Sequence, residues 1–321
     1  MHSCYNEIAV VGLVFDELVK NGVSEKGRNY VWDIARRKFL YMTPELADSF
    51  LELKNYGVYK SQIIDREVSL IKMCAKTIAN NIGNEPFNLV DIFCGDGTKA
   101  IELLKLIPKN LKIRYCPVNV CCYLADKAIE NVKNAGFENV VDYKKVLADC
   151  DGRTLRDLEQ GLKEGDYRRN VILLLGTILA SYDINDYLFE LSQEMSSEDY
   201  LIIGNGIRTG ERLAGIEKYG HEKMSSWFMH LMRYLGFNNN DVEYNARFGN
   251  SRVEMYYKLK VDKVIKREGK EVTLRAGDEV LVAILYKYFE EELKKFCSMY
   301  FSNVEIVTDE DKGYALVMCK K

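Results

Sequence analysis

The chain has 321 residues, of which 47% are hydrophobic and 29% charged, a composition typical of a globular protein with a substantial buried core. Its formal net charge is −3 with acidic and basic residues interspersed, so nothing in the charge balance indicates nucleic acid or an anionic membrane as a partner. With four prolines and no low-complexity tract, long disordered linkers are not expected either.

The cysteines, the histidines and the first apolar run exclude further classes of protein. Nine cysteines are scattered without a Cys-x-x-Cys pair, a pattern typical of reduced cysteines in the cytoplasm. None of the three histidines has a partner at ligand spacing, so no metal site is expected. The apolar run from Ile8 to Phe15 is broken by Asp16 and Glu17, so it predicts an amphipathic helix and neither a signal peptide nor a membrane span.

Between Glu67 and Gly204, predicted helices and strands alternate. Apolar residues at helical spacing predict a helix from Glu67 to Ile82, which Gly83 and Pro86 end. Mostly apolar runs bounded by turn residues predict buried strands at 87–93, 112–120, 140–146, 170–175 and 200–204. Helices are expected at 99–106 and 125–135, in a polar segment up to 164, and at 186–195. This alternation is typical of βαβ units and predicts a parallel sheet with helices on both faces.

After Gly204 the pattern changes. It predicts a helix at 210–235, strands at 241–244 and 252–259, a β-meander at 261–277, one long helix at 279–299, and a hairpin of 304–307 with 314–318. We therefore expect an α/β fold whose mostly parallel sheet ends in an antiparallel hairpin, with a smaller inserted α+β domain. The predicted parts are an N-terminal helical segment and substrate cap (1–63), a main domain (64–205 and 283–321) and an inserted substrate-side domain (206–282).

The stretch DIFCGDGTK, which begins at Asp91, is the strongest candidate for a ligand-binding loop. It follows the first predicted strand, and ligands of open parallel sheets bind beyond the carboxyl ends of the strands. Gly95 and Gly97 let the backbone approach a ligand closely. The G-x-G-x-x-A spacing also fits a nicotinamide dinucleotide, but its pyrophosphate would meet the carboxylates of Asp91 and Asp96. Those carboxylates favour the sulfonium and ammonium groups of S-adenosylmethionine. A turn without a ligand is the remaining alternative.

Polar residues at the ends of the next two predicted strands support a cofactor site. Asn119 stands where a ribose-binding group is expected, and its amide can hydrogen-bond both hydroxyls. Asp149, which precedes Cys150, stands where a carboxylate can accept a hydrogen bond from an adenine amino group. Each residue taken alone fits a loop or capping role equally well, but at successive strand ends they favour a ligand.

Several motifs occur in the order and approximate spacing of a known family: VDIFCGDGTK, IRYCPVNV, LLLGTILASYD, SRVEMYYKLK and AGDEVLVAILYKYFEEEL. With the upstream segment KFLYMTPELADSFLELKNYGVYKSQIIDRE, the chain resembles the histidine-specific N-alpha-methyltransferases from about Arg37 to Lys321. The resemblance implies a class I methyltransferase (Rossmann-like) fold, S-adenosylmethionine as cofactor, and a second domain that closes over the substrate. It implies cofactor contacts at Gly95, Gly97, Lys99, Asn119, Asp149 and Cys150, and with them we place Asp91 and Phe93 of the same turn.

The resemblance implies substrate contacts near Tyr41, near Tyr56 or Tyr59, in the loop from Gly176 to Ser181, and around Met255. The acceptor amine has to arrive neutral, so a proton relay is expected beside it. Our candidates for the relay are Tyr56, Tyr59 and Asp183, and our candidates for substrate contacts are Tyr41, Thr177, Ser181, Tyr182 and Met255. The structural alternatives are half-buried packing for the tyrosines, a helix N-cap for Asp183 and core packing for Met255.

The chain departs from the family's pattern most at the substrate positions. Ala180 cannot make the hydrogen bond with which the family's asparagine holds the substrate's backbone, unless a neighbour between Ser181 and Asp183 takes over that role. The family's glutamate and serine, which face the imidazole ring, fall on the apolar residues Ala283 and Leu285. A site that loses such groups loses much of its affinity, so we expect a substrate other than histidine. At the cofactor positions, Phe93 replaces a small residue and Asn119 an aspartate.

The leading hypothesis is an S-adenosylmethionine-dependent N-methyltransferase that acts on a small amine or an amino-acid derivative. A protein nitrogen is also open as the acceptor. The alternatives are an NAD(P)-dependent oxidoreductase, because of the G-x-G-x-x-A spacing, and a non-catalytic degenerate methyltransferase that binds the cofactor or a partner protein. We expect no partnership with nucleic acid or a membrane. We expect a cytoplasmic location.

Overall fold

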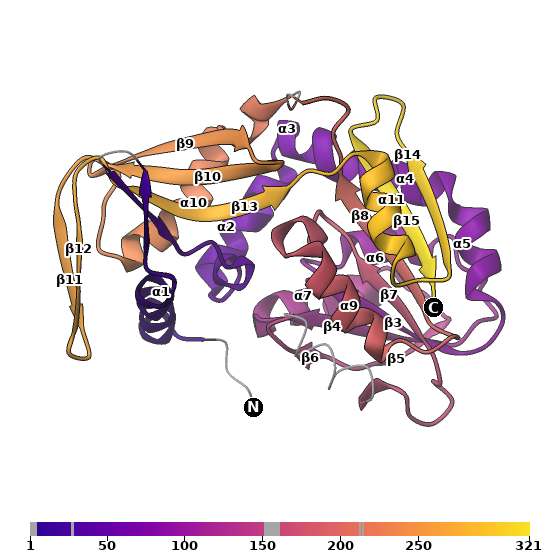
Figure 1. Ribbon diagram of the computed structural model, residues 1–321. Helices are drawn as coiled ribbons and strands as arrows, with labels where there is room; N and C mark the ends of the chain where they lie inside the picture. Colours follow the sequence, from indigo (N-terminus) through magenta and orange to yellow (C-terminus); the bar gives the residue numbers. More distant parts are fainter. Residues whose placement is uncertain (1–4, 27–28, 151–160, 212, 214) are drawn as a thin grey trace. The chain divides into compact units, whose positions relative to one another are not determined.

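The computed structural model describes residues 5–26, 29–150, 161–211, 213 and 215–321. These residues form two compact units (Figure 1). Unit 1 comprises the described residues of 3–56 and 212–286, and unit 2 those of 57–211 and 287–321. The domain boundaries placed from the sequence lay after residues 63, 205 and 282. Residues 151–160 of the polar segment predicted to be helical lie outside the described part of the chain.

Unit 2 is built on a mixed sheet with the strand order β14-β15-β8-β7-β3-β4-β5, and β6 pairs with β4. Neighbouring strands from β5 to β8 are parallel, whereas β15 pairs antiparallel with β8 and β14 with β15. The strands are β3 (Phe87–Ile92), β4 (Ile113–Asn119), β5 (Val140–Tyr143), β6 (Val146–Leu147), β7 (Asn170–Leu174), β8 (Tyr200–Gly206), β14 (Asn303–Thr308) and β15 (Tyr314–Lys320). The predicted mostly parallel sheet with a terminal antiparallel hairpin is confirmed.

The strand order places a switch point between β3 and β7, because the chain passes from β3 to β4 on one side and reaches β7 on the other. In open α/β sheets, ligands bind beyond the carboxyl ends of the strands at such a point. All residues of β3, β4, β7 and β8 are buried, as expected for parallel strands covered on both faces. A ligand site in unit 2 is therefore expected at the edge formed by the carboxyl ends of these strands.

Helices cover both faces of this sheet (Figure 1). The helices and shorter turns of unit 2 are α3 (Gly57–Tyr59), η2 (Lys60–Ile64), α4 (Asp65–Met73), α5 (Ala75–Ile82), α6 (Thr98–Leu104), α7 (Cys122–Asn134), η3 (Leu179–Ser181), α9 (Ile184–Glu194) and α11 (Glu290–Ser298). One apolar cluster joins α4, α5, α6 and α7 to one face, with Leu70 and Ile78 from the helices and Leu89 and Leu173 from the strands. In Figure 1, α9 and α11 lie in front of the strands.

Unit 1 has a sheet with the strand order β1-β2-β13-β10-β9 and a separate hairpin of β11 and β12. All its pairs are antiparallel except β2 with β13, which is parallel. Its elements are α1 (Glu7–Asn21), β1 (Val23–Lys26), β2 (Asn29–Asp33), η1 (Arg37–Leu40), α2 (Pro44–Asn55), η4 (Ile216–Tyr219), α10 (Glu222–Tyr234), β9 (Val242–Gly249), β10 (Arg252–Leu259), β11 (Lys263–Arg267), β12 (Lys270–Leu274) and β13 (Glu279–Tyr286). Rings of Tyr41, Phe50 and Trp227 pack together, with centroids 5.1–5.5 Å apart.

Several predicted elements are confirmed and one is wrong. The amphipathic helix around Ile8 to Phe15 is α1, and Val10, Val14 and Leu18 form its buried stripe. The single long helix from Glu279 to Met299 is wrong, because its first eight residues form β13 and only Glu290–Ser298 is helical. The run VLVAILY, which follows Glu279, is apolar throughout and carries no turn residue, so its periodicity does not separate a buried strand from a helix.

Smaller differences concern the ends and breaks of elements. The helix predicted from Glu67 to Ile82 is divided at Cys74 into α4 and α5. The strand predicted at 140–146 is two short strands, β5 and β6, both of which pair with β4. The N-terminal segment, predicted to be helical, also contains the hairpin of β1 and β2. Among the described cysteines, seven lie outside any disulfide: Cys74, Cys94, Cys116, Cys121, Cys150, Cys297 and Cys319. Cys122 is disulfide-bonded, so the expectation of reduced cysteines throughout is wrong at that position. Across the described residues, every helix falls short of the length and apolarity that a bilayer span requires.

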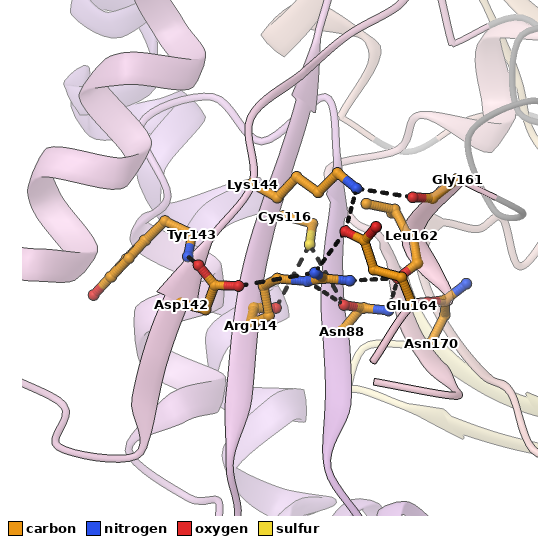
Figure 2. Close-up of polar contacts among 10 residues, drawn as sticks. All are labelled: Asn88, Arg114, Cys116, Asp142, Tyr143, Lys144, Gly161, Leu162, Glu164 and Asn170. Atoms are coloured by element: carbon orange, nitrogen blue, oxygen red, sulfur yellow. Dashed lines mark hydrogen bonds and ion pairs between the residues drawn. The ribbon is translucent and has the colours of Figure 1, made fainter. Parts of the chain in front are cut away.

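A buried polar network lies at the amino ends of β3, β4 and β7, opposite the expected ligand edge (Figure 2). The guanidinium group of Arg114 donates to Asn88 Oδ1 at 2.8 Å, to Glu164 Oε1 at 3.0 Å and to the carbonyl oxygen of Leu162. Asn88 Nδ2 donates to the Leu162 carbonyl at 3.0 Å and to Asn170 Oδ1 at 2.9 Å. The network therefore fastens the chain before β7 to the sheet, which is a structural role.

We expect Arg114→Leu to destabilise the protein strongly. The change leaves Asn88 Oδ1 and a buried carbonyl without their charged donor, and breaking such a buried charged network costs about 3–5 kcal/mol. Urea unfolding followed by circular dichroism measures the loss as a lower midpoint. Lys144→Met is the matched control, because Lys144 contacts the same Glu164 at 2.6 Å from the exposed side and should cost less than about 1 kcal/mol. Equal effects of the two substitutions would contradict this account.

Candidate functional site

The glycine turn after β3 combines a tight backbone with close packing. Gly95 and Gly97 have φ values of 56° and 77°, in the left-handed region that favours glycine. A Cβ at Gly97 would lie 3.1 Å from the carbonyl oxygen of Ala128 in α7 and 3.2 Å from the hydroxyl of Tyr115. Gly97 therefore lets α7 pack against the turn, and Gly95 is a second residue of the turn in the conformation that favours glycine.

Among the residues that follow the parallel strands of unit 2, three other than glycine share the left-handed conformation. Phe93 follows β3 with φ 52°, Cys150 comes shortly after β6 with φ 54°, and Thr177 comes shortly after β7 with φ 59°. This conformation is costly for a bulky or β-branched residue, and such strain concentrates at functional sites. Backbone strain at these three positions therefore points to the carboxyl edge of the sheet as a candidate functional site.

Phe93 stands at a position whose backbone favours glycine. We therefore expect Phe93→Gly to be more stable than Phe93→Ala by about 1 kcal/mol, the reverse of the usual order of these two residues. Both variants lose the phenyl ring, so their difference isolates the backbone term, and chemical denaturation measures it. The same pair at Ile92, which lies in β3 and has no positive φ, should show the usual order, with alanine the more stable. A more stable alanine variant at Phe93 would contradict the assigned strain.

Asp91, the fifth residue of β3, is a buried carboxyl group that receives one strong hydrogen bond. Its exposed fraction is 4%, and the hydroxyl of Tyr115 donates to its Oδ2 at 2.8 Å. Burial raises the pKa of Asp91 from 3.8 to about 6, against the lowering effect of Tyr115 and of the Lys99 ammonium. Burial thus disfavours the ionised form of this carboxyl group. A neighbouring cation would lower its pKa again and favour the carboxylate.

Lys99 is held by a carboxylate that the sequence analysis had not singled out. Its ammonium lies 2.7 Å from Glu67 Oε2, and Glu67 is fully buried in α4. Glu67 Oε1 accepts from the backbone N–H of Gly176 at 2.7 Å and from the Tyr314 hydroxyl at 2.8 Å. A Cβ at Gly204 in β8 would lie only 1.7 Å from the same oxygen. Glu67 therefore ties the lysine, the loop after β7 and strand β15 to one point.

A signal for Glu67 is present in the sequence. Leu70, Ile71, Cys74 and Ile78 form the buried stripe of the helical region, and Glu67 stands three and four residues before the first two. A charged residue at a stripe position is expected to be buried, and a buried carboxylate needs partners. Tyr314 gave no such signal, because its partner is 247 residues away in the chain.

Asn119 and Cys150 lie at the same carboxyl edge. Asn119 is buried, and its Oδ1 accepts from the backbone N–H of Cys121 at 3.0 Å, while its Nδ2 lies 3.9 Å from Cys94 Sγ. The amide thus shapes the turn that begins α7, the local role left open from the sequence. The carbonyl oxygen of Cys150 accepts from the Tyr187 hydroxyl at 3.3 Å, which holds the segment after β6 against α9. Asp149, beside it, is half-buried.

The loop after β7 carries the next predicted site residues. The Thr177 backbone N–H donates to the Gly204 carbonyl at 3.0 Å, and Ser181 ends the short turn η3. The ring of Tyr182 stacks on that of Tyr187 with centroids 4.7 Å apart. Asp183 is exposed and caps α9, since its Oδ1 accepts from two backbone N–H groups at 2.9 and 3.1 Å. This capping is the structural alternative that the sequence analysis kept for Asp183.

The predicted tyrosines are divided between the two units. Tyr59 belongs to unit 2 and packs, partly buried, against the large apolar cluster. Tyr56 belongs to unit 1, where its ring lies 4.3 Å from that of His221. Tyr41, also in unit 1, is 4% exposed and accepts a hydrogen bond from Arg37 at 3.3 Å, and burial raises the pKa of its phenol.

Met255 also lies in unit 1, on strand β10, and is 1% exposed. It stands directly opposite Ala283 of β13, and Val253 stands opposite Leu285. Side chains two residues apart on a strand share one face, so these four apolar residues form one patch. The patch brings Met255 together with the two positions where the resembling family has a glutamate and a serine.

The carboxyl edge of unit 2 fits a cationic cofactor better than an anionic one. The charges that act on Asp91 come from Asp96 and Glu67, which raise its pKa, and from Lys99 alone on the opposite side. Three carboxyl groups against one ammonium leave the turn negative, so a sulfonium or ammonium group is attracted and a pyrophosphate repelled. Gly95, on the same turn, has no Cβ and takes the left-handed conformation. The residues present therefore fit S-adenosylmethionine.

Comparison with solved structures finds chains of low identity. A S-adenosylmethionine-dependent methyltransferase from Clostridium acetobutylicum ATCC 824 is 14% identical, with 85% of this chain and 98% of that chain covered and a TM-score of 0.44. The CurJ carbon methyltransferase is 11% identical, with 98% and 67% covered and a TM-score of 0.48. PigF with SAH is 12% identical, with 99% and 70% covered and a TM-score of 0.45. A comparison with curated proteins finds no match.

The sequence profile of a family described as "histidine-specific methyltransferase, SAM-dependent" matches residues 46–321. The match includes the glycine turn, the loop after β7 and the patch around Met255. It confirms the resemblance stated from the sequence motifs, and it gives the nicotinamide alternative no support. Because the match spans most of the chain, this protein belongs to the histidine-specific, SAM-dependent methyltransferase family and is a methyltransferase with S-adenosylmethionine as its cofactor.

Proposed function

We propose that this protein methylates the nitrogen of a small amine or amino-acid derivative other than histidine. The observation that carries the proposal is Ala180, which is fully buried in the turn η3 of the loop after β7. Its side chain is a methyl group, so no rotation of that side chain can present a hydrogen-bonding atom to the backbone of an amino acid. Ala283 and Leu285 supply no hydrogen bond either, so the polar groups expected for histidine are missing from both places.

The patch of Val253, Met255, Ala283 and Leu285 supports an acceptor without an imidazole ring. An imidazole brings a donor and an acceptor nitrogen, and burying them against apolar side chains leaves both unsatisfied. A site that offers no strong hydrogen-bond donor or acceptor there disfavours histidine by the free energy of those missing hydrogen bonds, about 1–3 kcal/mol each. We therefore propose that the acceptor presents an apolar group, or no group, to this patch.

For the cofactor we propose roles that follow the positions of the residues. S-adenosylmethionine supplies an electrophilic methyl group on a sulfonium sulfur. Gly95 lets the backbone approach, and Asp91 faces the cationic part with its carboxylate. Asn119 reaches the ribose, and Asp149 and Cys150 the adenine. Phe93 forms a wall beside the turn. Lys99, held by Glu67, keeps the glycine turn and the loop after β7 in fixed positions relative to each other.

For the acceptor we propose that Thr177, Ser181 and Tyr182 line its path in the loop after β7. The amine has to lose its proton before its lone pair can attack, and Tyr56 or Tyr59 relays that proton. The carboxylate of Asp183 already accepts two hydrogen bonds as a helix cap, so the tyrosines are the stronger candidates. We also propose a cytoplasmic location, because the cysteines are scattered along the sequence without a Cys-x-x-Cys pair.

A screen with isotope-labelled S-adenosylmethionine tests the proposed function. The acceptors are the amino acids including histidine, polyamines and a cell extract, and mass spectrometry of the product locates the methyl group. We expect label on the nitrogen of an acceptor other than histidine. Histidine as the best acceptor, or a methyl group on carbon, oxygen or sulfur, would overturn the proposal. Cofactor binding without transfer to any acceptor would favour the non-catalytic alternative.

A further inference from the structure

The ion pair of Lys99 and Glu67 lies where the sheet is expected to bind a ligand. Lys99 is the second residue of α6, the helix that follows the glycine turn of β3. A Cβ at Gly176, two residues after the end of β7, would lie 2.5 Å from Lys99 Nζ. The side chain therefore crosses from the β3 side to the β7 side, and its ammonium lies at the switch point between these strands.

The two carboxylate oxygens of Glu67 have different partners. Oε1 accepts from the backbone N–H of Gly176 at 2.7 Å and from the hydroxyl of Tyr314 at 2.8 Å. Oε2 lies 2.7 Å from Lys99 Nζ, and no other donor in the described part of the chain reaches it. One oxygen thus holds parts of the fold together, whereas the other meets only Lys99.

Burial differs between the two members of this pair. The side chain of Glu67 is fully buried, whereas that of Lys99 keeps 19% of its surface exposed. An ammonium group has three N–H donors, so it can bind Glu67 and a second anionic group together. Glu67 therefore supports Lys99 from the buried side and leaves it accessible to a ligand.

The charges around Lys99 indicate what kind of ligand group it meets. The Lys99 ammonium is close enough to Asp91 to lower the pKa of that carboxyl group, so charges of opposite sign lie near each other at this edge. The amino-acid end of S-adenosylmethionine also carries two opposite charges, an ammonium and a carboxylate. Attraction between opposite charges therefore directs the cofactor's carboxylate to Lys99 and its ammonium to Asp91.

We propose that Glu67 is a positioning residue for the cofactor, because it holds the Lys99 ammonium where it meets the carboxylate of the cofactor's amino-acid end. The inference rests on the cofactor roles proposed above and sharpens the role of Lys99, and it does not depend on which acceptor is methylated. A lysine has a flexible four-carbon side chain, and ordering it costs conformational entropy. Glu67 orders that side chain before the cofactor arrives, which lowers the entropic cost of binding.

The experiment compares Glu67→Gln, Lys99→Met and the double variant with the wild type by calorimetry. Glutamine keeps an oxygen that accepts from Gly176 and Tyr314, but it has no negative charge for Lys99. The ligands are S-adenosylhomocysteine, which has the amino-acid end, and methylthioadenosine, which lacks it. The matched control is Glu102→Gln, which removes the carboxylate of another ion pair of α6, the one with Lys105 at 2.5 Å, and should change neither affinity.

We expect Glu67→Gln to weaken the binding of S-adenosylhomocysteine about 10-fold and Lys99→Met about 30-fold. Methylthioadenosine should bind to all of these proteins with the same affinity. The double variant should bind S-adenosylhomocysteine as weakly as Lys99→Met does, because Glu67 acts through the lysine and has nothing to position once the lysine is absent.

Stability should respond in a different order, which separates positioning from a purely structural role. Lys99→Met leaves the buried carboxylate of Glu67 without its counter-charge, so it should lower the melting temperature. The double variant removes both charges and should regain most of that loss, although its affinity stays low. Thermal unfolding of the ligand-free proteins measures both effects.

Equal weakening of the two ligands in Glu67→Gln, or strictly additive losses of affinity in the double variant, would overturn the proposal. Unchanged affinity of Lys99→Met for S-adenosylhomocysteine would overturn it as well. Should Lys99→Met fail to fold, the double variant gives the test, because it has to lose affinity for S-adenosylhomocysteine and keep its affinity for methylthioadenosine. No acceptor is present in these measurements, so they can fail while the proposed N-methylation holds, and the acceptor screen can fail while they succeed.

Discussion

Gly204→Ala should destabilise the protein on the order of 4 kcal/mol and lower its melting temperature by roughly 10 °C. The added Cβ would lie 1.7 Å from Glu67 Oε1, far inside van der Waals contact, so the carboxylate has to leave its position. It then loses the N–H of Gly176, the hydroxyl of Tyr314 and the ammonium of Lys99 while still buried. Thermal unfolding followed by circular dichroism measures the shift.

Two further variants separate this explanation from a general sensitivity of glycines. Gly57→Ala introduces the same methyl group where no heavy atom lies within 4 Å, and it should leave the melting temperature nearly unchanged. In Glu67→Ala the clashing oxygen is absent, so adding Gly204→Ala to that variant should cost far less than it costs the wild type. Strictly additive effects of the two substitutions would show that the clash is not the cause.

Asp91→Asn should weaken S-adenosylmethionine binding about 100-fold at pH 7.5 without destabilising the protein. The amide keeps the shape of the side chain and can still accept the hydrogen bond of Tyr115, which Asp91 receives at 2.8 Å. It lacks the negative charge that faces the cofactor's cationic groups. Calorimetry with S-adenosylmethionine measures the affinity, and thermal unfolding of the cofactor-free protein measures the stability.

The pH dependence of the wild type follows from the raised pKa of Asp91. The folded value of about 6 lies above the ordinary value of 3.8, so the folded protein binds this proton more tightly than the unfolded chain. The buried carboxylate therefore lowers stability on the order of 3 kcal/mol above pH 6, and this penalty disappears as the pH falls towards 4. Asp91→Asn should remove the penalty at neutral pH and leave stability unchanged or higher.

Cofactor affinity depends on pH in the opposite direction. The cationic cofactor prefers the ionised carboxylate, so wild-type affinity should fall as the pH drops below 6, whereas Asp91→Asn should lack this decrease. A variant that loses stability and binding together at pH 7.5 would indicate a structural role for Asp91. Loss of binding without loss of stability, the expected result, is typical of a carboxylate that serves function.

The sequence predicted the core of unit 2 because its signals are local. Strands such as Phe87–Ile92 and Tyr200–Gly206 are short apolar runs between turn residues, and parallel strands buried on both faces have that composition. The glycine turn and the residues at the strand ends followed from the rule that parallel strands present their carboxyl ends at one edge. For β13 the same kind of apolar run merged with a following helix and was assigned to it.

Contacts between distant parts of the chain could not be predicted in the same way. Glu67 meets Tyr314 across 247 residues, and Lys287 reaches Gly206 across 81. Neither pair has a local pattern, because each depends on a glycine in β8 that leaves space for a side chain from elsewhere. Phe93 is the complementary case: the sequence showed it as an unusual residue in the turn, and only the backbone φ of 52° explains what is unusual about it.

The parallel pair of β2 and β13 has a consequence for how the chain acquires its structure. Val31 stands opposite Glu279, and the indole N–H of Trp32 donates to the buried carboxylate of Asp278 at 3.1 Å, so these contacts join residues about 250 positions apart. Contacts of such high sequence separation form slowly and late in folding. During synthesis the hairpin of β1 and β2 leaves the ribosome long before its partner strand exists. Unit 1 therefore completes its sheet only after nearly the whole chain has been made. Until then the edge of β2 that will pair with β13 has no partner strand and is open to misassembly.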